Sequence, residues 1–127
     1  MKTFMDLTVG DTVYKVVYAN DSEYPLCVEK EKVTALEGTY SGYVMKTAKE
    51  NEVPSRGYFI DMYYIGGPYA DYNGCTIWWD KNGLRQFINE CLLECQKRFD
   101  EMIAKINDMD KMSFNYDEDG NKVQDDR

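Results

Sequence analysis

Side chains that commonly carry out acid–base catalysis are scarce in this 127-residue chain. It has no histidine, and therefore lacks the side chain whose unperturbed pKa lies near neutral pH. Carboxylates such as Asp61 and Asp71 could act as a general acid and base, but no pattern in the sequence places them together. Glycine-rich phosphate loops, nucleophile-elbow motifs and metal-binding histidine motifs are also missing from the sequence. We therefore expect a non-enzymatic protein without catalytic residues.

The four cysteines are the next candidates for chemistry. They are Cys27, Cys75, Cys91 and Cys95, and no Cys-x-x-Cys pair occurs. Cys91 and Cys95 are four residues apart, so on a helix they share one face, where they serve as small apolar side chains. A four-thiolate zinc site would require Cys27 and Cys75 to converge on that pair. We expect reduced thiols in a cytoplasmic protein, with no metal and no other cofactor.

The C-terminal residues 113–127 resemble half of a calcium-binding loop. Three oxygen-bearing side chains stand at loop positions one, three and five, followed by glycine at six: Asn115, Asp117, Asp119 and Gly120. However, the twelfth position is Asp126, one methylene shorter than the usual glutamate, and Lys122 replaces the usual hydrophobic residue. The segment carries five acidic and two basic residues. We expect an acidic flexible tail rather than a calcium site.

Aromatic residues are concentrated between residues 63 and 79, on both sides of a glycine-rich loop. Tyrosine and tryptophan are favoured at protein interfaces because they combine a large apolar area with a polar tip. Adjacent strand residues face opposite sides, so one of Trp78 and Trp79 should be in the core and the other should face outward or lie under a helix. Ordinary core and sheet packing is the alternative. The candidate partner-binding residues are Tyr69, Tyr72, Trp78 and Trp79.

Residues 80–112 show the periodicity of one long amphipathic helix. Asp80 is a suitable N-cap, and the apolar residues recur at steps of three and four. These residues are Leu84, Phe87, Ile88, Cys91, Cys95, Phe99, Met102, Ile106 and Met109. Such a helix would be roughly 50 Å long, whereas the preceding 79 residues would form a globule only about 30 Å across.

The apolar side chains at the far end of this helix must therefore be shielded from water. Either the helix breaks near residues 98–100 and folds back, or a partner covers its apolar stripe. Near-heptad spacing favours pairing with a second copy. The candidate oligomer-interface residues are Phe99, Met102, Ile106 and Met109.

The charge pattern excludes some partners. The formal net charge is −8, and the parts before and after Trp79 carry −4 each (7 basic and 11 acidic residues, then 8 and 12). Such a surface repels phosphate backbones, so we expect no direct nucleic-acid binding. No apolar run is long enough to span a membrane. Residues 1–9 include Asp6 and lack a long apolar core, so they do not read as a secretion signal.

Five runs rich in β-branched and aromatic residues precede the helix, at 12–18, 26–36, 40–47, 58–65 and 75–79. The chain should leave the sheet at Pro68, and residues 69–74 read as a loop. We predict an α+β fold, in which a small curved antiparallel sheet or SH3-like barrel of four to five strands is followed by one long C-terminal helix. Residues 1–112 would form a single domain, with a β-rich part at 1–79 and the helix at 80–112.

Two short segments carry a resemblance. The segment 7–14, Leu-Thr-Val-Gly-Asp-Thr-Val-Tyr, resembles the opening strand of small SH3-like barrel proteins of gut bacteria and their phages. The segment 77–84, Ile-Trp-Trp-Asp-Lys-Asn-Gly-Leu, resembles the strand-to-helix junction that closes many such proteins. The resemblance implies a barrel fold and an accessory or binding role, and it transfers no catalytic residue.

These observations favour a non-enzymatic accessory protein, bacterial or phage-encoded, that binds an unidentified protein and forms a homo-oligomer through its helix. One alternative is an acidic inhibitor that occupies the nucleic-acid channel of a host defence enzyme. It would align carboxylates on one face at spacings resembling phosphates. Another alternative is a virion or other assembly component, which would form larger oligomers. A hydrolase would require a deep pocket with converging carboxylates.

Overall fold

The chain divides into two compact units whose boundary lies inside a helix. The computed structural model describes residues 1–20, 22–50, 56–111 and 119–121. The first unit is Met1–Cys91 and the second is Leu92–Arg127. All described strands belong to the first unit. Most of the predicted tail and of the calcium-like loop at 115–126 lies outside the described residues.

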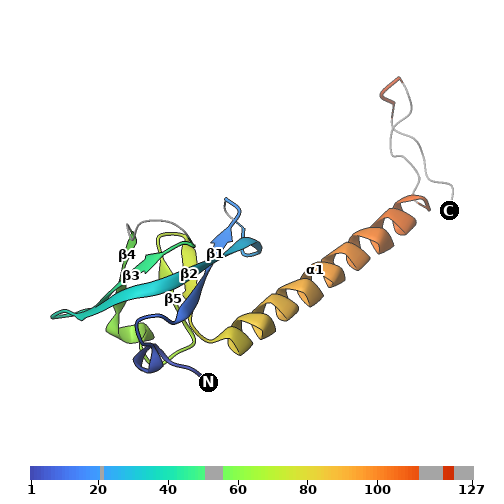
Figure 1. Cartoon of the computed structure of the whole chain (residues 1–127). Coiled ribbons are helices and arrows are strands. Elements are labelled where there is room, and N and C mark those ends of the chain that lie inside the picture. The colour runs from blue at the N-terminus through green and yellow to red at the C-terminus, as the bar shows by residue number, and fades with distance from the viewer. Residues whose placement is uncertain (21, 51–55, 112–118, 122–127) are drawn as a thin grey trace. The chain divides into compact units, whose positions relative to one another are not determined.

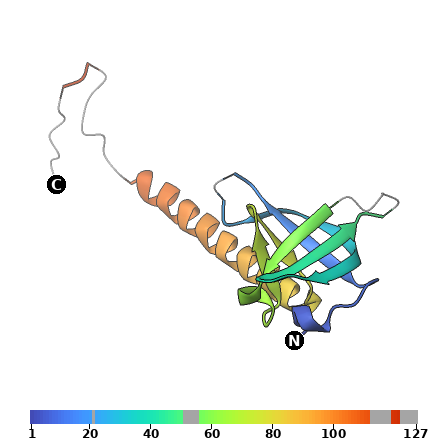
Figure 2. The same ribbon diagram turned by 90° about the vertical axis from the view of Figure 1, so that its left-hand side faces the viewer.

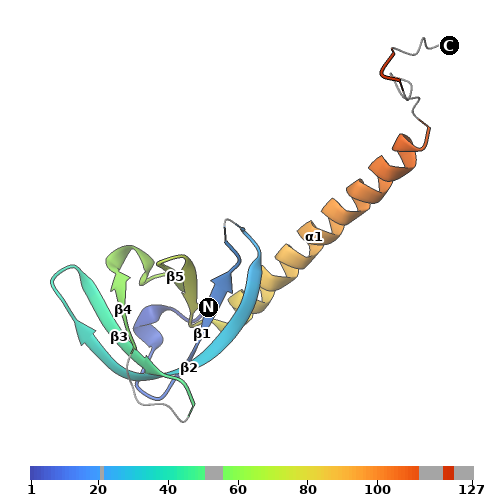
Figure 3. The same ribbon diagram turned by 90° about the horizontal axis from the view of Figure 1, so that it is seen from above.

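Six antiparallel strands form a single sheet in the first unit (Figure 1). They are β1 (Thr12–Tyr18), β2 (Pro25–Gly38), β3 (Gly42–Ala48), β4 (Arg56–Asp61), β5 (Tyr69–Tyr72) and β6 (Cys75–Trp78). Their order is β4-β3-β2-β1-β6-β5. The edge strands β4 and β5 approach each other, so the sheet curls into a nearly closed barrel (Figure 3). The prediction of a curved antiparallel sheet followed by a long helix is confirmed, with six strands instead of four or five.

The additional strand is β5, in the stretch predicted to be a loop. It pairs with β6 through the two-residue turn Asn73-Gly74. Both residues have positive φ, 45° and 79°, as hairpin turns that match the twist of the strands require. Four residues are too few to display a clear alternation, whereas the Asn-Gly pair itself is a strong hairpin signal in the sequence.

Strand β4 is shorter than predicted. It ends at Asp61, and the next residues form a 3-10 helix, η2 (Met62–Tyr64). The Asp61 carboxylate accepts a hydrogen bond from the Tyr63 backbone N–H at 2.8 Å, which caps the turn and stops the strand. The prediction of one strand through Ile65 was therefore wrong in its second half.

The barrel interior holds the main core. Its buried side chains are Phe4, Leu7, Val13, Val33, Met45, Tyr58, Ile60, Ala70, Cys75, Ile77 and Trp79. Trp79 is 2% exposed, and its indole N–H donates to the Gly67 carbonyl at 2.8 Å. Phe4 lies in a short 3-10 helix, η1 (Phe4–Asp6), and meets the Trp79 ring edge-on at 5.3 Å. The N-terminal segment thus closes part of the barrel.

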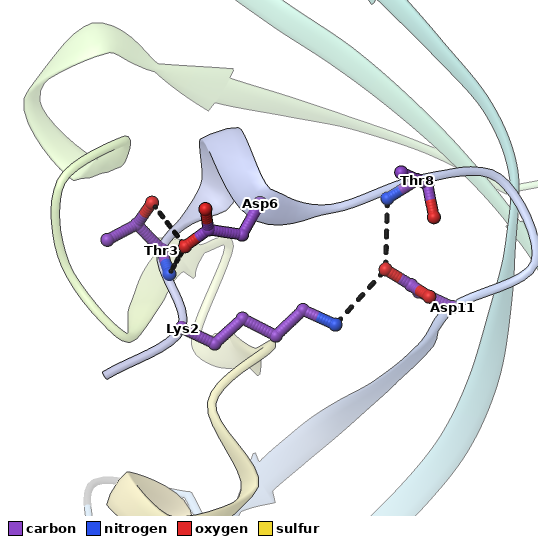
Figure 4. Close-up of polar contacts among 5 residues, drawn as sticks. All are labelled: Lys2, Thr3, Asp6, Thr8 and Asp11. Atoms are coloured by element: carbon purple, nitrogen blue, oxygen red, sulfur yellow. Dashed lines mark hydrogen bonds and ion pairs between the residues drawn. The ribbon is translucent and has the colours of Figure 1, made fainter.

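Two carboxylates hold this N-terminal segment in place (Figure 4). Asp6 accepts from the backbone N–H of Thr3 at 2.9 Å and from its hydroxyl at 3.1 Å. Asp11 accepts from the Thr8 backbone N–H at 2.9 Å and from the Lys2 ammonium at 3.1 Å. The Thr3 contacts lower the pKa of Asp6, and the Thr8 N–H followed by Lys2 lowers the pKa of Asp11. Each bond favours the charged carboxylate.

The helix α1 (Lys81–Met109) is continuous over 29 residues (Figure 2), or about 43 Å. Asp80 caps its first turn, because its carboxylate accepts from the Gly83 N–H at 3.2 Å, which confirms the predicted cap. The helix does not break between residues 98 and 100. It ends at Met109, three residues before the predicted end. No helix in the described part of the chain is long and apolar enough to cross a membrane.

Candidate functional site

A second apolar cluster lies on the outer face of the sheet, under the first turns of α1. We call it the outer cluster. Its buried members are Val16, Trp78 and Leu84, and its partly buried members are Tyr14, Tyr18, Tyr69, Phe87 and Ile88. Residues 14, 16 and 18 of β1 share a face because strand side chains alternate. Trp79 packs inside the barrel and Trp78 packs under the helix, as the alternation argument predicted.

Trp78 is the centre of a stack of three rings within the outer cluster. The Tyr69 ring lies 4.4 Å from the Trp78 ring at an interplanar angle of 25°, and the Phe87 ring lies 5.3 Å away at 20°. Trp78 is 5% exposed. Both candidate tryptophans are therefore too buried to offer a broad contact surface, and the partly exposed Tyr69 and Phe87 provide the accessible aromatic edge.

A hollow of about 580 Å³ opens beside this stack. Its described lining is Tyr18, Ala19, Asn20, Ser22, Glu23, Tyr69, Asp71, Gly74, Cys75, Thr76, Trp78 and Phe87. The aromatic side chains come from β1, β5, β6 and α1, so the hollow exists only after the sheet and the first turns of the helix have assembled. Two acids and no base occur among these lining residues. The rim therefore favours a cationic group next to an apolar one.

Thr76 organises the floor of the hollow. Its hydroxyl accepts from the Trp78 indole N–H at 2.9 Å and lies 3.0 Å from the Tyr18 hydroxyl. Burial raises the pKa of Tyr18, and the Thr76 contact opposes this effect in part. These bonds fix the two rings, while burial favours the neutral Tyr18 phenol.

Tyr72 does not join Tyr69 in the hollow. It packs against the barrel core, where its ring meets Tyr58 edge-on at 5.1 Å. Positions 69 and 72 are an odd number of residues apart on one strand, so they face opposite sides. The proposed pair of exposed tyrosines therefore does not form a single patch. The alternation rule would have separated them if β5 had been recognised as a strand.

Asp61 and Asp71, the sequence candidates for an acid–base pair, are both exposed. The Asp61 carboxylate caps η2, while the Asp71 carboxylate accepts from the Tyr64 hydroxyl at 3.1 Å. Burial, followed by Asp71, raises the pKa of Tyr64. Each carboxylate thus has a local structural role.

Sequence reasoning missed the buried carboxyl of Glu31. This side chain is 2% exposed. It accepts from the Thr47 hydroxyl at 2.5 Å and from the Tyr58 hydroxyl at 2.9 Å. Glu31 and Val33 alternate with the exposed Lys30 and Lys32 on β2, a pattern that indicates an inward-facing acid. The network joins β2, β3 and β4 within the barrel.

The apolar side chains in the second half of α1 are exposed. Leu92, Phe99, Met102, Ile106 and Met109 are each between 55% and 63% exposed. Cys95 lies on the same side of the helix and is partly buried. All four predicted oligomer-interface residues thus lie on one continuous helix within the second unit.

All four cysteines are described, and none forms a disulfide. Among the residues that the structure describes, no group of three cysteine and carboxylate side chains is placed to hold a metal ion. Comparison of the chain with protein-family models, with curated proteins and with solved structures finds no match.

Proposed function

We propose that this chain is a non-enzymatic protein-binding accessory protein that self-associates through the second half of α1. The observation that carries the proposal is the continuous stripe of exposed apolar side chains at residues 92–109. Soluble proteins rarely leave large contiguous apolar surfaces in water, and such surfaces commonly mark interaction sites. The apolar face of an amphipathic helix is well suited to pair with another helix.

Sedimentation of the full chain over a range of concentrations tests self-association. The proposal expects a mass that rises from one copy to two as concentration increases. A single-copy mass throughout the micromolar range would overturn it. A series of much larger species would instead support the alternative of a virion or assembly component.

The outer hollow is our candidate site for the protein partner. The occupant we propose is a short peptide segment that places a basic side chain near Asp71 and Glu23 and an apolar one against Tyr69 and Phe87. The acidic rim and the aromatic wall support this choice, because cations are attracted both to carboxylates and to ring faces. The overall charge of −8 would also speed the approach of a basic segment.

Selection from a displayed random-peptide library would test the hollow. Peptides recovered on the wild-type protein should be enriched in lysine or arginine next to aromatic or aliphatic residues. Asp71→Lys should abolish the preference for basic peptides. Lys46→Asp changes an exposed residue of β3 outside the hollow and should preserve it. Recovery of the same basic peptides by Asp71→Lys would contradict the assignment of the rim.

The nucleic-acid-mimic alternative has less support from the described helix. Its aligned acids Glu94, Glu101 and Asp108 are seven residues apart, which spaces them by about 10.5 Å. Phosphates of one DNA strand advance about 3.4 Å per nucleotide along the axis. In addition, Arg98 lies 3.5 Å from Glu94 and offsets one of these charges.

We further propose that the protein works in the cytoplasm and belongs with SH3-like accessory proteins of bacteria or phages. Four cysteines without a disulfide favour a reducing compartment. The nearly closed six-stranded barrel is compatible with the SH3-like resemblance of segments 7–14 and 77–84. Measuring the thiol content of the protein isolated from its native cells would test the compartment, since oxidised cysteines would argue against it.

A further inference from the structure

The exposed stripe of α1 follows a heptad register. Assigning position a to Leu92 places six of the apolar residues alternately at a and d. The a residues are Leu92, Phe99 and Ile106, and the d residues are Cys95, Met102 and Met109. A strict a/d repeat is the pattern of two helices that pair along a narrow seam. The register covers about two and a half heptads, which is short, so we expect weak, concentration-dependent pairing.

The flanking charges distinguish between the two possible directions of pairing. The g positions of this register are Cys91, Arg98 and Lys105, and the e positions are Gln96, Ile103 and Asp110. The Asp110 N–H donates to the Ile106 carbonyl at 3.2 Å, so the helical hydrogen bonding includes Asp110. At the g positions Arg98 and Lys105 are cations, and at the e positions Asp110 is an anion.

In a parallel pair, each g residue faces the e residue of the next heptad on the other helix. Lys105 of each copy then faces Asp110 of the other, which gives two attractive contacts by symmetry. Arg98 faces Ile103, against which its aliphatic stem can pack. No like charges meet at the seam of this arrangement.

In an antiparallel pair, g residues face g residues. Every alignment that keeps at least four a–d layers then sets Arg98 against Lys105, Arg98 against Arg98, or Lys105 against Lys105. Like charges directly opposite one another destabilise association. Among these arrangements, only the parallel, in-register pair gives an attractive contact on both sides of the seam.

We infer that two copies of this chain pair as a parallel, in-register, two-stranded coiled coil over residues 92–110. This inference rests on the proposed self-association and adds its direction, its register and its layers. In this arrangement every d residue packs against its own counterpart. The two Cys95 side chains meet at one layer, and the two Met109 side chains meet two heptads further on.

Thiol cross-linking of the full chain tests the register at two separated layers. One variant carries Cys27→Ser and Cys91→Ser, so that Cys95 is the helix thiol and Cys75 stays in the core. A second variant adds Cys95→Ser and Met109→Cys. Diamide accepts the two electrons and two protons that a pair of thiols gives up on forming a disulfide. The matched control adds Cys95→Ser and Lys97→Cys, which moves the thiol to the outer side of the helix.

Both layer variants should form covalent dimers rapidly, and the Lys97→Cys control should form few. The two layers are about 21 Å apart, so an antiparallel pair could bring at most one of them to its own counterpart. Cross-linking at a single layer, or equal cross-linking of the control, would overturn the inference. Sedimentation of the reduced variants separates the two proposals. A dimer that cross-links at only one layer, or at neither, refutes only the parallel register. A monomer refutes self-association itself.

Exchanging charges provides an independent test, because it should change the dissociation constant in opposite directions for parallel and antiparallel pairs. In a parallel pair, Lys105→Glu replaces two attractions with two repulsions, and the dissociation constant should rise by about five- to thirtyfold. Adding Asp110→Lys should restore it. In an antiparallel pair, Lys105→Glu would instead relieve cation–cation contacts and lower the dissociation constant, which would overturn the inference.

Discussion

Replacing Ile106 with aspartate is the most direct test of the stripe on α1. Ile106 is 57% exposed in the single chain, so pairing can remove about that fraction of its surface from water. Complete burial of an isoleucine contributes about 1.5–3 kcal/mol, and the exposed fraction therefore contributes about 1–2 kcal/mol. Each dimer contains two copies of the residue, so the loss is about 2–4 kcal/mol. This corresponds to a dissociation constant about 30- to 800-fold higher.

Sedimentation equilibrium at several concentrations measures this change. Ala104→Asp is the matched control, because it introduces the same charge two residues away on the opposite side of the same helix, where Ala104 is exposed. Circular dichroism of both variants should show similar helix content, since both replace a residue within α1 by aspartate. An Ile106→Asp dissociation constant within threefold of the wild-type value, or an equal effect of Ala104→Asp, would refute the reasoning.

Three further predictions concern the barrel unit. Asp11→Asn should lower the free energy of unfolding above the ordinary aspartate pKa of 3.8. Because the folded-state pKa is lowered, the Asp11 contribution is complete above that value and disappears as pH falls through the folded pKa, so urea titrations of wild type and variant should converge in acid. Glu31→Ala should cost about 2–5 kcal/mol in urea unfolding, because it removes the acceptor shared by two buried hydroxyls, and Glu31→Gln should cost less; an equal loss would show that the acceptor does not matter. Gly74→Ala should cost about 1 kcal/mol because Gly74 has a φ of 79°, whereas Gly66→Ala, in open space without a positive φ, should be neutral in the same assay.

The sequence was most informative where one strong periodicity acted alone. Asp80, followed by apolar steps of three and four, predicted α1 and its N-terminal cap. The spacing left open whether the helix breaks near residues 98–100, and the structure shows one continuous helix there. The exact end, Met109 instead of residue 112, depends on the last few hydrogen bonds of the helix, which leave little trace in residue types.

The sheet was predicted less accurately than the helix. Both wrong predictions concern places where a short turn or a side-chain cap determines the structure. Asp61 ends β4 by capping η2 with its side chain, and alternation alone cannot reveal such a cap. Strand β5 has four residues and is recognisable only from the Asn73-Gly74 turn that joins it to β6. Missing β5 had a functional consequence, because Tyr69 and Tyr72 were then assigned to one patch although they face opposite sides of the sheet.

The hollow could not be predicted because its walls come from distant parts of the chain. Tyr18 and Thr76 are 58 residues apart and meet at 3.0 Å, and Phe87 reaches Trp78 from the helix. None of these residues carries a motif by itself. The same holds for Glu31, since its role depends on Thr47 and Tyr58 on two other strands. Such networks follow from strand order and register, which depend on many residues of the sequence acting together.

The apolar side chains of α1 change from buried to exposed along the helix, as its two proposed roles require. Leu84, Phe87 and Ile88 are buried or partly buried because they cover the outer face of β1, β5 and β6. Ile88 occupies a d position, one heptad before Cys95, but it already packs in the outer cluster. The proposed pairing seam therefore begins at Leu92. The first turns therefore stabilise the hollow within one chain, and the later turns keep the same spacing with apolar side chains that are exposed among the described residues. A substitution at Ile106 should accordingly weaken pairing and leave the hollow intact, and a substitution at Phe87 should do the reverse.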